Sequence, residues 1–135
     1  MKFDKEYISE ADCPEIQGLQ RYLSVYDEYA NRGGMPIPAV QIILDKKDMA
    51  HKNKKSYRDY IVWLPLSHRL DDEICKVCKD NPKWLYMFCT SFDDRDTFLP
   101  YEAYIETDEE ENLYYQNEDN PLLAKIKLLK ELLNG

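Results

Sequence analysis

Two cysteines separated by two residues are the side chains of this sequence best spaced for chemistry. Cys75 and Cys78 form the pair; His68 precedes it and Cys89 follows it. Thiolate and imidazole groups are the usual ligands of zinc, but a structural zinc site usually carries two such pairs. A redox pair lies at the amino end of a helix, where the dipole lowers the pKa of the thiol. This pair falls near the end of an expected helix, so we expect buried or inert thiols with no metal or redox role.

Other signatures of catalysis or nucleotide binding do not occur in the sequence. There is no G-x-S-x-G elbow, and the four glycines form no phosphate-binding loop. The aspartates of residues 93–96 are spaced like those of a calcium-binding loop, but the glycine and the closing Glu of such a loop are absent. His51 and His68 are expected on the surface. The sequence therefore predicts no catalytic residue, cofactor or metal, and the alternative is a small enzyme whose site is assembled from scattered Cys, His and carboxylate residues.

Tyrosine and negative charge are the unusual features of the composition. The chain has eleven tyrosines and a net charge of −8, and residues 93–120 contain eleven Asp or Glu against one Arg. Such a chain is a poor general binder of nucleic acid and suits a protein with a basic surface. Tyrosine supplies contact area at interfaces. The predicted partner-binding residues are Tyr101, Tyr104, Asp108, Glu109, Glu110, Glu111, Tyr114 and Tyr115.

Two interpretations that involve no partner compete with this prediction. A run of acidic residues is usually a solvated loop that aids solubility. Tyrosines are also common in half-buried strands, because aromatic side chains favour strands. Both interpretations remain open at the level of the sequence.

The elements that would position these residues begin with a helix. Ser9 or Asp12 could cap it, and Pro14 suits its first turn. We expect this helix to end before the turn signal at residues 31–34, while residues 25–29 either extend it or form a short strand.

Two strands and a loop are expected next. Residues 39–44 and 59–64 are rich in β-branched and apolar side chains, and they predict two neighbouring strands of one sheet. Residues 45–58 carry six Lys or Arg against two Asp and predict a solvated loop between them.

The second half of the chain gives stronger signals. Ser67 is expected to cap a helix that has Leu70 and Ile74 on its apolar face. Strands are expected at residues 84–89, 101–106 and 113–115. Asn120 and Pro121 then predict the start of a last helix, whose leucines recur at helical spacing.

Together these elements predict an α+β fold in a single globular domain over residues 1–135. The order α-β-β-α-β-β-α indicates an antiparallel or mixed sheet of four to five strands packed with three helices. No apolar run approaches the roughly 20 residues of a membrane span. The charged N-terminus lacks the apolar core of a signal peptide, so we expect a cytoplasmic protein.

Two short strings resemble small uncharacterised proteins encoded by phages and prophages. They are Asp12-Cys13-Pro14-Glu15-Ile16-Gln17 and Trp63-Leu64-Pro65, the latter before a helix that contains Leu70. The likeness covers about residues 9–75 and implies an α+β fold and a phage or prophage origin, but no activity and no site residues. We accordingly expect a non-enzymatic interaction protein, a phage- or prophage-encoded modulator that binds a basic host protein.

Overall fold

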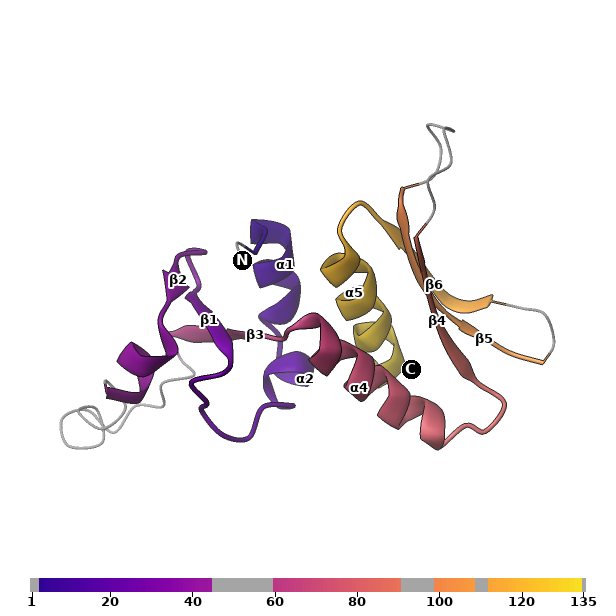
Figure 1. The fold of residues 1–135 in the computed structure, drawn as a ribbon, viewed down its shortest axis with the longest axis horizontal. Coiled ribbons are helices and arrows are strands. Elements are labelled where there is room, and N and C mark those ends of the chain that lie inside the picture. Colours follow the sequence, from indigo (N-terminus) through magenta and orange to yellow (C-terminus); the bar gives the residue numbers. More distant parts are fainter. Residues whose placement is uncertain (1–2, 45–59, 91–98, 109–111, 135) are drawn as a thin grey trace. The chain divides into compact units, whose positions relative to one another are not determined.

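The computed structural model describes residues 3–44, 60–90, 99–108 and 112–134 (Figure 1). The chain divides into two compact units, Met1–Leu66 (unit 1) and Ser67–Gly135 (unit 2). The α+β class is confirmed, because each unit combines helices with antiparallel strands. The single sheet of four to five strands is wrong: the described residues form two sheets of three strands each. One domain over residues 1–135 stays a prediction.

Unit 1 contains a sheet with the strand order β2-β1-β3. Its elements are α1 (Lys5–Ala11), α2 (Pro14–Gln17), β1 (Glu28–Asn31), β2 (Pro36–Ile37) and β3 (Ile61–Leu64). The single first helix beginning at Ser9 or Asp12 is therefore wrong. α1 ends before Asp12. Cys13 is extended because a residue that precedes proline disfavours the helical conformation, and Pro14 then opens a second, short helix.

Residues 39–44 are helical, and the strand predicted there is also wrong. The amides of Gln41 and Ile42 donate to the Pro38 carbonyl at 3.1 and 3.3 Å, so the proline opens a helix. Ile42 is buried while Val40 and Leu44 are exposed, which a strand would not produce because residues two apart share a face. Short apolar runs do not distinguish the two structures by composition. β1, and not this segment, pairs with β3.

Side-chain hydrogen bonds attach the short helices of unit 1 to its sheet. The Gln17 side chain bonds the backbone of Trp63 twice: its Nε2 donates to the Trp63 carbonyl at 2.9 Å, and its Oε1 accepts from the Trp63 amide at 2.8 Å. The buried Tyr7 hydroxyl donates to the Pro65 carbonyl. Gln17 and Trp63 lie 46 residues apart, so these bonds attach α2 to β3.

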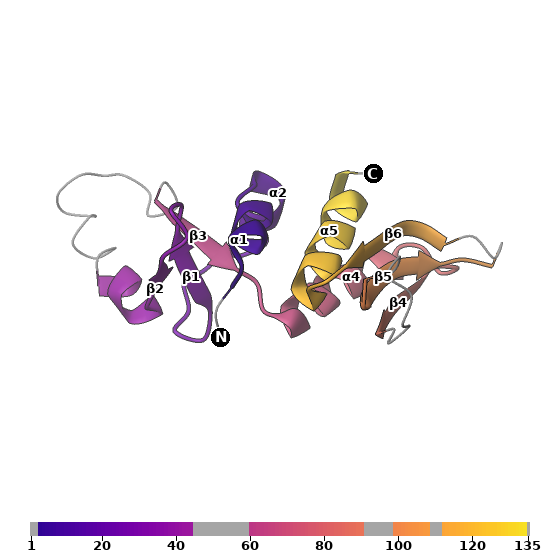
Figure 2. The same cartoon turned by 90° about the horizontal axis from the view of Figure 1, so that it is seen from above.

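Unit 2 is a sheet with two helices on one face. Its elements are α4 (Ser67–Lys79), β4 (Leu85–Thr90), β5 (Tyr101–Glu106), β6 (Asn112–Glu118) and α5 (Pro121–Asn134). The strands are antiparallel in the order β4-β5-β6. Figure 2 shows α4 and α5 on the same side of this sheet.

The expected helices and strands of this half are confirmed apart from small shifts of their ends. The Asn120 Oδ1 accepts from the Leu122 amide at 2.8 Å and so caps α5, as predicted. Leu70 and Ile74 are buried, and Ser67 is the first residue of α4 rather than its cap. Among the described residues, no helix has both the length and the apolar character needed to cross a membrane.

Candidate functional site

The helices of unit 2 cover one face of its sheet. Ala103 and Ile105 of the central strand β5 are fully buried. On β4, Tyr86 pairs with Ile105 in the register, and its hydroxyl donates to Asp71 of α4 at 2.8 Å. Successive side chains of a strand point to opposite faces. The residues between these buried ones therefore point away from α4 and α5.

The opposite face, which we call the helix-free face, combines apolar, aromatic and acidic side chains. Leu85 is 58% exposed and Tyr115 is 40% exposed. The charged residues described on this face are Glu102 and Glu106, and none is Lys or Arg. Its side chains are Leu85, Met87, Cys89, Glu102, Tyr104, Glu106, Asn112, Tyr115 and Asn117.

Two tyrosines lie side by side at the centre of the helix-free face. The ring centroids of Tyr104 and Tyr115 are 5.9 Å apart, with the rings tilted by 34°. The Tyr115 hydroxyl donates to Glu102 Oε1 at 2.5 Å. Burial and this hydrogen bond raise the pKa of Tyr115 to about 12. Burial and a hydrogen bond with Cys89 also raise the pKa of Tyr104.

A β-bulge decides which tyrosine joins this pair. The register of β5 and β6 shifts between Ala103 and Ile105, so that Tyr114 and Tyr115 both lie opposite Tyr104. Tyr114 has φ +56°, a left-handed conformation that costs a non-glycine residue roughly 1–3 kcal/mol. Its ring meets Trp84 edge to face at 5.8 Å.

The structure brings together part of the predicted partner-binding set. Tyr104 and Tyr115 are in contact on the helix-free face, whereas Tyr101 stacks on Phe88 at 6.2 Å among side chains of the helix-covered face. Tyr114 packs against Trp84. Asp108 is exposed just beyond β5. The predictions for Glu109, Glu110 and Glu111 lie outside the described residues.

Sequence reasoning missed the other members of the helix-free face. Glu102 accepts a hydrogen bond from Tyr115, and Met87 lies directly opposite Tyr104 in the register. Glu102 and Glu106 could have been found from strand alternation, because residues two positions before and after Tyr104 share its face of the strand. Met87 could be identified only from the pairing of β4 with β5, which no local sequence signal indicates.

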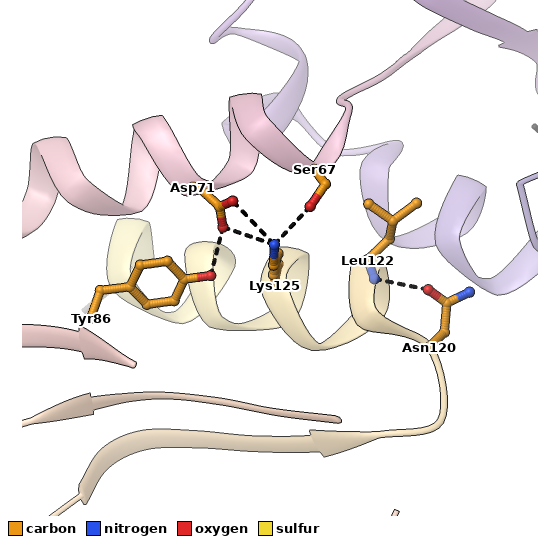
Figure 3. A network of polar contacts seen from close by, with 6 residues as sticks. All are labelled: Ser67, Asp71, Tyr86, Asn120, Leu122 and Lys125. Carbon is orange, nitrogen blue, oxygen red and sulfur yellow. Dashed lines mark hydrogen bonds and ion pairs between the residues drawn. The ribbon is translucent and has the colours of Figure 1, made fainter. Parts of the chain in front are cut away.

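A second polar cluster lies on the helix-covered side and has a structural role (Figure 3). The Lys125 Nζ lies 3.0 Å from Asp71 Oδ1 and donates to Ser67 Oγ at 2.7 Å. A serine beside a lysine can act as a nucleophile with its base. Here the Lys125 Nζ is shared between Ser67 and the Asp71 carboxylate. The cluster therefore joins α4 to α5.

The Cys75–Cys78 pair lies on the outer part of α4. Cys75 is exposed and Cys78 is half-buried. Burial, and then the neighbouring Cys75, raise the pKa of Cys78 and disfavour its thiolate. Cys75 lines a hollow of about 220 Å³ together with Arg69, Asp72, Lys76 and Lys79. Within the described residues, no group of three or more His, Cys, Asp or Glu is arranged to hold a metal ion.

Unit 1 carries a separate pair of exposed tyrosines. Tyr22 and Tyr26 are 82% and 86% exposed. The loop that presents them is fixed from within, because the Tyr29 hydroxyl accepts from Gln20 Nε2 at 2.6 Å and from the Ser24 amide at 3.2 Å. The helical spacing of Ile16, Leu19 and Tyr22 would place Tyr22 on the same helix face as the other two. However, α2 ends at Gln17, so Tyr22 lies beyond the helix.

No family model, curated protein or solved structure matches this chain. Among the described residues, the helix-free face combines exposed apolar side chains with carboxylates and carries no Lys or Arg.

Proposed function

We propose that this chain is a non-enzymatic interaction protein that binds a basic protein through the helix-free face of unit 2. One observation carries the proposal: exposed apolar and aromatic side chains lie beside carboxylates, with no described basic side chain among them. A strand face that only contacts water needs no such apolar area. Covering it with a partner removes Leu85 and Tyr115 from water, which favours binding.

The two kinds of side chain have separate roles in this proposal. Aromatic residues near the centre of an interface contribute most of the affinity. Carboxylates select a partner of opposite charge and speed its approach. In the sequence, residues 93–120 contain eleven acidic side chains against one Arg, so the segment that includes β5 and β6 is strongly negative. A nucleic acid is disfavoured because its phosphates carry the same sign of charge.

The phage resemblance supplies the biological side of the proposal. In a phage- or prophage-encoded modulator, the basic partner is a protein of the host. The enzyme alternative gains no support from the groups nearest to the required chemistry. Lys125 is paired with Asp71, and burial disfavours the Cys78 thiolate.

Capture from a bacterial lysate at low salt tests this function. The baits are the full-length chain, a face variant with Tyr104→Ser and Tyr115→Ser, and a control with Tyr22→Ser and Tyr26→Ser. We expect basic proteins on the wild type and on the control, and their loss from the face variant.

Raising the salt concentration provides a second readout of the same experiment. The captured proteins should elute as the screening length shortens toward about 8 Å at physiological ionic strength. Capture that survives in the face variant and disappears in the unit 1 control would contradict the proposed function.

A further inference from the structure

The centre of the helix-free face is an aromatic platform between two carboxylates. Tyr104 belongs to β5, the middle strand of the sheet. Met87 lies opposite it on β4, and the ring of Tyr115 on β6 lies 5.9 Å away. Glu102 and Glu106 occupy the positions two residues before and after Tyr104 on the same face. Each is therefore about 7 Å along the strand from Tyr104.

One carboxylate is held beside the rings. Glu102 Oε1 accepts from the Tyr115 hydroxyl at 2.5 Å, so its position is linked to the ring that forms one side of the platform. A cation that lies flat on these rings would be close to Glu102. The site thus offers two attractions to the same cation: the face of an aromatic ring and a carboxylate.

This combination distinguishes between the two basic side chains. The guanidinium of arginine is planar, stacks on aromatic faces and can donate two parallel hydrogen bonds to a carboxylate. It also loses its hydration more readily than an ammonium does. The ammonium of lysine is a compact, strongly hydrated charge that gains less from a flat platform.

We propose that the helix-free face is selective for arginine, with the guanidinium of a partner arginine stacked on the Tyr104–Tyr115 pair and paired with Glu102. This inference rests on the proposed function and specifies the side chain by which the basic partner is anchored. Glu106 provides a second carboxylate at the other end of the platform.

Calorimetric titration of the full-length chain with octa-arginine and with octa-lysine at low salt tests the selectivity. The wild type should bind octa-arginine more tightly. Tyr104→Leu removes a ring and should weaken octa-arginine binding about two- to fivefold, the usual contribution of an exposed cation–π contact. Tyr104→Phe keeps the ring and should keep the preference for octa-arginine. Glu102→Gln should weaken octa-arginine binding by a similar factor.

Two further variants separate the site from charge in general. Glu109→Gln, Glu110→Gln and Glu111→Gln together remove three charges from the segment that follows β5 in the sequence, and should weaken both peptides while keeping the ratio of their affinities. Far-UV circular dichroism would show whether Tyr104→Leu alters the fold. In that case Tyr115→Leu, at an exposed position, removes the other ring of the pair and should weaken octa-arginine binding in the same way.

The outcomes distinguish this inference from the proposed function. Equal affinity of the wild type for both peptides would overturn the arginine selectivity and leave the proposed function standing. A preference for arginine that survives both Tyr104→Leu and Tyr115→Leu would place arginine elsewhere and overturn the site. Binding of neither peptide would overturn the proposed function itself.

Discussion

The ion pair between Lys125 and Asp71 should respond very differently to the loss of its two members. The Lys125 side chain is 8% exposed and that of Asp71 is 39% exposed. The ammonium therefore depends on protein contacts, namely Asp71, Ser67 Oγ and the ring of Phe88 at 4.3 Å. The carboxylate also has water and the Tyr86 hydroxyl. This asymmetry predicts the order of the two effects.

The magnitudes follow from what each variant leaves behind. At 3.0 Å the two charges attract by roughly 5 kcal/mol at an effective dielectric constant of about 20, and desolvation offsets much of this. Asp71→Asn leaves a buried ammonium without its counter-ion, and should cost about 3–5 kcal/mol of unfolding free energy. Lys125→Met leaves a carboxylate that can rehydrate, so we expect a cost of about 1 kcal/mol or less. The double variant should cost less than Asp71→Asn alone.

Urea denaturation followed by circular dichroism measures these free energies, and thermal melting provides a check. About 1 kcal/mol should lower the Tm by roughly 3–5 °C in a chain of this size. Lys83→Met, an exposed position, is the control and should stay within about 0.5 kcal/mol of the wild type. If Lys125→Met cost as much as Asp71→Asn, the burial argument would be refuted.

Three further predictions concern other parts of the chain. Leu129→Ala should cost about 2–5 kcal/mol in urea denaturation because Leu129 is fully buried in α5; unchanged stability would contradict this. The raised pKa of Tyr115 stabilises the fold below pH 10, and this contribution is lost as the pH rises toward about 12. Alkaline absorbance titration should therefore show a tyrosine that ionises near pH 12 and is missing in Tyr115→Phe. Elemental analysis of protein purified without chelator should find well under one zinc per chain, and stoichiometric zinc lost in Cys75→Ser would refute that.

The second half of the fold could be predicted because its signals are local. Asn120 and Pro121 fix the start of α5 through a side-chain cap and a preset φ angle. Tyr101–Glu106 forms a strand with the bounds that the sequence indicated. These signals require no knowledge of distant residues.

The first half could be predicted only in part: the strand expected at residues 59–64 is β3, but the elements before it differ. Residues 39–44 have a strand-like composition, but Pro38 opens a helix in which Ile42 is buried while Val40 and Leu44 are exposed. The attachment of α2 depends on hydrogen bonds between Gln17 and Trp63, which lie 46 residues apart. Such non-local contacts outweigh the local propensities of short elements.

The candidate site was predicted in part for a similar reason. An excess of tyrosine and acid near β5 and β6 pointed to Tyr104 and Tyr115. The bulge at Tyr114 then separates neighbouring tyrosines, and alternation places Tyr101 with the side chains of the covered face. Composition does not encode either effect.

Amide chemical shifts of the isotope-labelled, full-length chain, recorded during titration with octa-arginine at low salt, show whether arginine binds at the helix-free face. We expect saturable shifts that are largest at Met87, Glu102, Tyr104 and Tyr115. We also expect these shifts to weaken as salt is added, because charge attraction is screened. Largest shifts in α4 or around Tyr22 and Tyr26, with the helix-free face unchanged, would contradict binding at this face.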